Sequence, residues 1–211
     1  MPTKSLSEDA NGNTVLPSDD LQELLRPGKE FESKLTAAIK ALPLGTTHLL
    51  LVRVADYATA GHTILRHFSA QKMPGVYVTI NKPYLDLVKG LVNPPENVQY
   101  VDAITALTGR DMPETPRITY LDSPLSLVEL NLAIAEKLRG IASNAKFLVM
   151  DSISTLLVYN AAQAVEKFCH TVIAKNRTEN IMGLFLMVES EENQAVVDTL
   201  SQFVDGVIRI G

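Results

Sequence analysis

The sequence holds a single cysteine, Cys169, and no tryptophan. One cysteine excludes an intramolecular disulfide and any metal site built from a cluster of cysteines. No run approaches the roughly 20 apolar residues that a membrane-spanning helix requires. The first residues are polar and acidic, unlike a signal sequence. We therefore expect a cytoplasmic protein without a membrane span.

Signatures of several other classes of protein are also missing. The G-x-S-x-G elbow of Ser-His-Asp hydrolases does not occur. The histidines are scattered and show no ligand spacing for zinc. A net charge of −5 argues against general nucleic-acid binding, which needs a positive surface. A general role in coating DNA or RNA is therefore not expected.

The 211 residues are enough for one large domain with an arm, and 46% of them are hydrophobic. Residues 1–16 are polar and are predicted to form a flexible tail. Residues 17–43 are predicted to form a helical arm, in which a short helix begins at Ser18 and ends before Pro27-Gly28. The remaining residues, 44–211, are predicted to form the folded domain.

Within this domain, apolar runs alternate with amphipathic stretches. The predicted strands are Leu49–Val54, Gly75–Ile80, Val98–Val101, Ile118–Leu121, Phe147–Asp151, Met182–Val188 and Gly206–Ile210. The predicted helices are Gly61–Gln71, Tyr84–Leu91, Pro124–Ile141, Ala161–Asn176 and Asn193–Phe203, with a loop over Ala103–Pro116. This alternation predicts an α/β fold, with a mainly parallel central sheet and helices on both faces.

One strand ends in residues that are typical of a nucleotide site. Phe147-Leu-Val-Met-Asp151 is an apolar run that ends in an acid, and Ser152-Ile-Ser-Thr155 follows it directly. A buried parallel strand of this kind delivers a carboxylate to a magnesium nucleotide in the Walker B arrangement.

The phosphate loop that usually accompanies such a strand is altered. After the strand His48–Val54, the chain reads Asp56-Tyr-Ala-Thr-Ala-Gly61-His62-Thr63. Compared with G-x-x-x-x-G-K-[ST], Gly61 and Thr63 match, whereas Asp56 replaces the first glycine and His62 replaces the lysine.

Taken together, Phe147-Leu-Val-Met-Asp-Ser-Ile-Ser-Thr155 and Phe203-Val-Asp-Gly-Val-Ile-Arg-Ile210 resemble the KaiC-like branch of the RecA superfamily of P-loop ATPases. The resemblance covers roughly residues 44–211. It implies a three-layer RecA-like fold with a nucleotide at the carboxyl ends of the strands, where Thr63 and Asp151 would bind magnesium. It also implies association with another copy or with a RecA-like ATPase.

Two departures from the family predict that ATP hydrolysis is lost. Asp56 would place a like charge near the phosphates, which costs about 4 kcal/mol at ~4 Å and an effective dielectric of ~20. His62 is too short to replace lysine. Beyond Gly75–Ile80, where the family carries acidic residues, this chain has Asn81 and Lys82, and neither is a carboxylate base. We therefore expect a catalytically inactive pseudo-ATPase with no catalytic residue and no cofactor, acting as a binding or regulatory module.

Other interpretations of the same residues remain open at this stage. The residues of the vestigial nucleotide site are Asp56, Gly61, His62, Thr63, Lys82, Asp151 and Ser152. An Asp56–Lys82 salt bridge is one way to fill the vacated phosphate position, and Ser152 is also suited to satisfying backbone groups after the strand. Alternatively, a divergent protein binds Mg-ATP weakly, or hydrolyses it slowly, through Asp151, Thr63 and Lys82. A third interpretation is a sensor that binds nucleotide without turnover.

Overall fold

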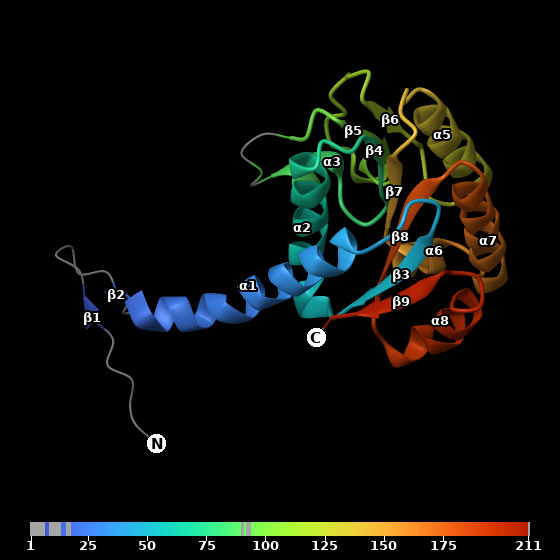
Figure 1. Cartoon of the computed structure of the whole chain (residues 1–211). Coiled ribbons are helices and arrows are strands. Elements are labelled where there is room, and N and C mark those ends of the chain that lie inside the picture. Colours follow the sequence, from blue (N-terminus) through green and yellow to red (C-terminus); the bar gives the residue numbers. More distant parts are fainter. Residues whose placement is uncertain (1–6, 9–13, 16–17, 90, 92–93, 211) are drawn as a thin grey trace.

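The computed structural model describes residues 7–8, 14–15, 18–89, 91 and 94–210, with side chains from residue 28 onward. Figure 1 shows an α/β domain from which one long helix, α1, extends. The strands of the domain are β3 (Thr47–Val52), β4 (Gly75–Thr79), β5 (Val98–Asp102), β6 (Ile118–Tyr120), β7 (Lys146–Asp151), β8 (Ile181–Val188) and β9 (Gly206–Arg209). The helices are α1 (Ser18–Lys40), α2 (Tyr57–Ala70), α3 (Tyr84–Val88), α4 (Thr105–Thr108), α5 (Leu127–Arg139), α6 (Ile153–Tyr159), α7 (Ala162–Thr178) and α8 (Gln194–Leu200), with 3-10 turns η1 (Val54–Asp56) and η2 (Glu191–Asn193).

The seven strands of the described domain form one sheet in the order β6-β5-β4-β7-β8-β3-β9. Every pairing in it is parallel. All seven predicted strands are therefore confirmed, and the apolar runs of β3, β7 and β8 lie in its interior, as strands buried on both faces must. The carboxyl ends of these strands meet at one edge of the sheet.

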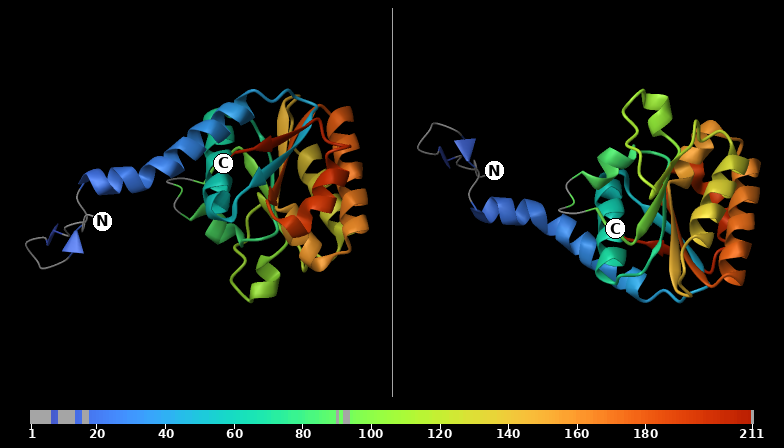
Figure 2. Two further views of the ribbon diagram at one scale, coloured as in Figure 1. Left: turned by 90° about the horizontal axis from the view of Figure 1, so that it is seen from below. Right: turned by 90° about the horizontal axis from the view of Figure 1, so that it is seen from above.

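Alternating side chains of each strand supply two hydrophobic cores, one on each face. On β7, Leu148 and Met150 belong to the core covered by α5, α6, α7 and α8. Phe147 and Val149 belong to the core covered by α1, α2 and α3. Figure 2 shows these two sets of helices on opposite sides of the sheet. The predicted α/β architecture with helices on both faces is confirmed.

The N-terminal arm differs from the prediction. The helix that was expected to end before Pro27-Gly28 continues through both residues as α1, which runs from Ser18 to Lys40. Its second half is held by packing, because Phe31, Leu35 and Ile39 are buried at helical spacing against the α2 side of the sheet. Most of the predicted tail lies outside the described residues. Its described parts, Ser7–Glu8 and Thr14–Val15, pair antiparallel as β1 and β2.

Three further segments correct the sequence analysis. The loop predicted over Ala103–Pro116 contains the short helix α4. The residues after β7, where the sequence analysis predicted no helix, form α6. Most importantly, α2 begins at Tyr57 and not at Gly61, so that the segment compared with a phosphate loop is helical.

Candidate functional site

The carboxylate of Asp151 lies at the carboxyl end of β7, as predicted, but it is enclosed by tyrosines. Only 3% of Asp151 is exposed. The hydroxyl of Tyr57, from the first turn of α2, donates a hydrogen bond to Oδ1. The hydroxyl of Tyr77, from β4, donates a hydrogen bond of 2.5 Å to Oδ2. Each carboxylate oxygen therefore already accepts a hydrogen bond from a neighbouring element.

The register of the sheet explains why Tyr77 reaches this carboxylate. In the β4–β7 pair, Tyr77 lies opposite Val149 and Thr79 lies opposite Asp151. Residues two apart on a strand share one face, so Tyr77 and Asp151 point to the same side of the sheet, toward α2. The Tyr57 side chain extends from α2 and donates its hydrogen bond to Asp151 on this same side of the sheet.

Gly61 permits the close approach of α2 to this cluster. A Cβ atom at this position would lie 3.1 Å from the Tyr77 hydroxyl and 3.6 Å from Asp151 Oδ2. In the sequence, Gly61 matches the second glycine of a phosphate loop. The structure places it one helical turn after Tyr57. A larger residue there would crowd the Tyr77 hydroxyl and the Asp151 carboxylate, which are hydrogen-bonded to each other.

Burial sets the protonation behaviour of the cluster. Desolvation raises the pKa of Asp151, whereas the hydrogen bonds from Tyr57 and Tyr77 and the positive charge of Lys82 act in the opposite direction. Desolvation, followed by the neighbouring Asp151 carboxylate, likewise raises the pKa of Tyr57 and of Tyr77. Both tyrosines are therefore protonated donors throughout the physiological pH range.

Lys82 and Ser152 lie around the tyrosines. The Lys82 ammonium is 5.6 Å from the centroid of the Tyr57 ring, within the range of a cation–π contact. Burial and the Asp151 carboxylate raise the pKa of Tyr57, and hydrogen bonding of Ser152 and Asn81 with its hydroxyl offsets only part of that rise. The Ser152 hydroxyl also accepts a hydrogen bond from the Thr155 N–H at 3.3 Å and thus caps α6.

The other predicted site residues point elsewhere. Asp56 forms an ion pair with Arg53 at 2.6 Å, so the interpretation of an Asp56–Lys82 salt bridge is wrong. A ring nitrogen of His62 lies 3.0 Å from the Leu87 carbonyl oxygen of α3. Thr63 follows Gly61 by two residues, about 200° around the helix, and therefore lies on another face of α2.

The Thr63 hydroxyl has its neighbours on the α1 side of the domain. It accepts a hydrogen bond of 3.5 Å from the Arg66 guanidinium. Arg66 in turn forms an ion pair with Glu32 of α1 at 2.8 Å. The structure thus brings Gly61, Lys82, Ser152 and Asp151 together, and it directs Asp56, His62 and Thr63 to other contacts.

A second buried carboxylate at this edge was missed by the sequence analysis. Asp102 at the end of β5 is fully buried. It accepts hydrogen bonds from the backbone N–H groups of Tyr84, Ile104 and Thr105, and from the Thr105 hydroxyl at 2.6 Å. These donors make Asp102 a connector between β5, α3 and α4. The sequence did contain a signal for this residue, because Asp102 follows directly after the apolar pair Tyr100-Val101 at the end of a predicted strand.

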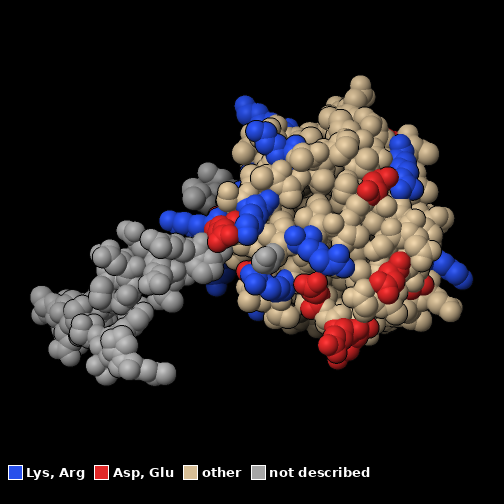
Figure 3. All heavy atoms as spheres, turned by 60° about the horizontal axis from the view of Figure 1, so that its bottom comes forward, with Lys and Arg blue, Asp and Glu red and all other residues tan. Residues whose placement is uncertain are grey.

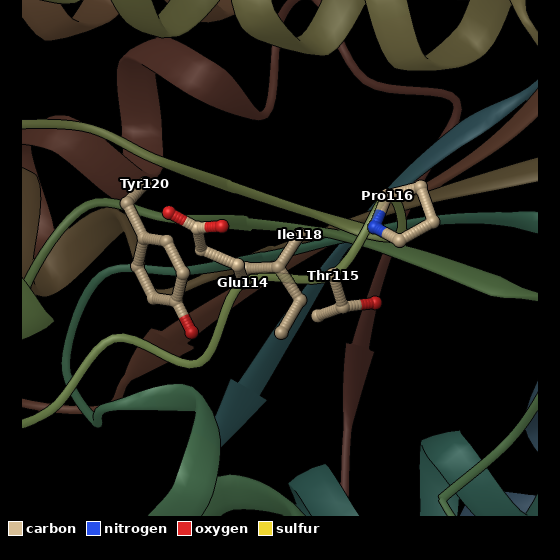
Figure 4. Close-up of a pocket in the computed structure, with 5 residues that line it drawn as sticks. All are labelled: Glu114, Thr115, Pro116, Ile118 and Tyr120. Carbon is tan, nitrogen blue, oxygen red and sulfur yellow. The ribbon is translucent and has the colours of Figure 1, made fainter.

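A separate hollow of about 470 Å³ lies beside the edge strand β6, lined by Glu114, Thr115, Pro116, Ile118 and Tyr120. Figure 4 shows Tyr120 and Glu114 at one end and Pro116 at the other. Three strand spacings, about 14 Å, separate β6 from β7. The hollow is therefore distinct from the Asp151 cluster.

No group of three or more His, Cys, Asp or Glu side chains within the described part of the chain is arranged to hold a metal ion. No helix within it combines the length and the apolar character needed to cross a membrane.

The parallel sheet with helices on both faces is the RecA-like α/β fold. It is similar to the crystal structure of the KaiC-like protein PH0186 from the hyperthermophilic archaeon Pyrococcus horikoshii OT3, with a TM-score of 0.57 and 16% sequence identity. The match covers 80% of this chain and 72% of that one. The chain belongs to a family of unknown function, DUF7504, whose model matches residues 45–210. A search of curated proteins finds no match.

Proposed function

We propose that this protein is a RecA-fold module that has lost ATP hydrolysis and acts by binding another protein. The observation that carries the proposal is the enclosure of Asp151 by the hydroxyls of Tyr57 and Tyr77. A Walker B acid must offer its oxygens to magnesium and its water ligands. Here these oxygens accept protein hydrogen bonds, and the carboxylate is buried.

The backbone of α2 supports the same conclusion. A phosphate loop binds phosphate through N–H groups that have no partner within the protein. In an α-helix that begins at Tyr57, the N–H groups from Gly61 onward bond to carbonyl groups four residues earlier. The N–H groups of Gly61, His62 and Thr63 therefore bond within the helix instead of to phosphate.

Charge at the start of α2 adds to this effect. The free N–H groups of a first helical turn attract anions. In this protein the residue directly before α2 is Asp56, whose negative charge opposes a phosphate. Arg53 neutralises part of that charge in the ion pair, but its guanidinium is thereby engaged.

The interpretation as a divergent ATPase requires Thr63 and Asp151 in one magnesium shell. The contacts of Thr63 with Arg66, on the α1 side, do not favour that arrangement. Lys82 is near Asp151, but neither it nor Asn81 supplies the carboxylate that orients water for hydrolysis.

Two features of the surface favour a protein partner. Apolar side chains project at the carboxyl edge of the sheet, where Val54, Leu85 and Leu107 are 77%, 45% and 50% exposed. On the face drawn in Figure 3, Lys and Arg side chains are interspersed with Asp and Glu. Apolar groups among mixed charges suit a protein surface better than a phosphate backbone.

A phosphate-release assay with Mg-ATP tests the proposal. The wild-type protein and Asp151→Asn are expected to give the same background rate, because Asp151 takes no part in catalysis. A wild-type rate above background that is lost in Asp151→Asn would overturn the proposal. A rate that is equal in both proteins is attributable to a contaminating ATPase.

A further inference from the structure

A shallow apolar groove runs between α5 and α7, on the face of the sheet opposite α1. Its volume is about 260 Å³. Val128 and Leu132 of α5 form one wall and are 72% and 61% exposed, whereas Phe168 and Ala164 of α7 form the other. Val128 and Leu132 are four residues apart and therefore neighbours on the helix surface. Such a groove has the form that receives an amphipathic helix.

The chain itself contains a helix with the required pattern. The N-terminal half of α1 extends beyond the sheet and its covering helices (Figures 1 and 2). Its sequence places Leu21, Leu24 and Leu25 at i, i+3 and i+4, the spacing of anchors for a helix groove. Ten residues of helix are about 15 Å long, enough to cover the roughly 10 Å between Ala164 and Thr171.

The charges of the two elements are complementary. Asp19, Asp20 and Glu23 make the beginning of α1 acidic. The cation that lines the groove is Lys167. Opposite charges at the rim of an apolar contact favour one register of docking over others.

We infer that the N-terminal half of α1 docks into the α5–α7 groove of a second copy of this chain. The two elements of one chain lie on opposite sides of its sheet (Figure 2), so a chain cannot fill its own groove. Contact between different surfaces produces a reciprocal dimer, a ring or a chain of subunits, depending on the rotation between copies.

This inference rests on the proposed binding function and names a partner for it. The two are tested separately, because the groove lies on the opposite face of the sheet from Tyr57. Loss of assembly in a groove variant leaves the phosphate-release result unchanged. Conversely, ATP hydrolysis by the wild type would leave the groove contact intact.

Light scattering coupled to gel filtration provides the first test. The wild type is expected to have a mass above that of one chain, and Val128→Glu and Leu132→Glu the mass of one chain. Met112→Glu is the matched control, because Met112 is also an exposed apolar residue but lies outside the groove, in the segment between α4 and β6. A monomeric wild type, groove variants that keep the wild-type mass, or dissociation by Met112→Glu would overturn the inference. Circular dichroism checks that each variant is folded.

Cross-linking provides a second test that does not rely on destabilising the contact. One copy carries Leu24→Cys and the other carries Leu132→Cys, and the native Cys169 is fully buried. On mild oxidation of the mixture, we expect a disulfide-linked pair containing one chain of each kind. A mixture that yields no mixed pair, or no more than a Leu24→Cys and Met112→Cys control mixture yields, would contradict the inference.

Discussion

Tyr77 and Asp151 form a buried hydrogen bond of 2.5 Å between the adjacent strands β4 and β7, at the carboxyl edge of the sheet. Tyr57 completes the arrangement from α2. A carboxylate that is hydrogen-bonded on both oxygens stabilises the packing of α2 on the sheet. The residue from which the sequence predicts a vestigial nucleotide site thus connects elements of the fold.

The first prediction concerns the energy of this hydrogen bond. Tyr77→Phe leaves a buried acceptor without its donor and is expected to lower the free energy of unfolding by about 1–3 kcal/mol. Tyr100→Phe is a matched control, because Tyr100 is paired with Tyr77 in the sheet and its buried hydroxyl has no partner among the described residues. It is expected to cost nothing. Equal losses for the two variants in urea denaturation would refute the role of the Tyr77 bond.

The second prediction concerns Gly61. Alanine at this helical position normally gains about 1 kcal/mol over glycine. Here its Cβ would lie 3.1 Å from the Tyr77 hydroxyl, so Gly61→Ala is expected to lower stability. The loss should shrink in a Tyr77→Phe background, where the hydroxyl is absent. Gly140→Ala is the control, because its nearest atom would lie 3.5 Å away. Thermal unfolding in which both variants behave alike would contradict the close approach.

The third prediction concerns pH. Because burial raises the pKa of Asp151 above 3.8, the folded state holds that proton more tightly than the unfolded state does. The free energy of unfolding therefore falls as pH rises from 3.8 through the raised pKa, by about 1.4 kcal/mol for each unit of the difference.

The variant Asp151→Asn has no such proton to lose. Its stability relative to the wild type is therefore expected to increase as pH rises through the same window. Urea denaturation at a series of pH values measures this difference. A difference that stays constant with pH, or one that decreases, would show that Asp151 is not held as described.

The sequence predicted the sheet because continuous apolar runs such as Phe147–Met150 have few alternatives to a buried parallel strand. The helical start of α2 was missed for a different reason. Tyr57, Ala60, Ile64 and Phe68 carry a helical pattern, but the comparison with the phosphate-loop motif assigned this segment to a loop.

The contacts of the candidate site were harder to foresee. Asp151 was identified correctly as a residue of the carboxyl edge. The contact between Tyr77 and Asp151 depends on the register between β4 and β7, which are distant in sequence. These strands pair through backbone hydrogen bonds, which do not depend on residue type, so the sequence does not reveal the register. The direction of Thr63 likewise depends on where α2 begins.

The most direct test of the account is calorimetric titration of the wild-type protein with Mg-ATP. Tyr57 and Tyr77 occupy the oxygens of Asp151, and the N–H groups of α2 from Gly61 onward bond within the helix. We therefore predict no saturable heat at nucleotide concentrations up to about 1 mM, which corresponds to a binding free energy weaker than about −4 kcal/mol. Saturable binding in that range that disappears in Asp151→Asn would contradict the account.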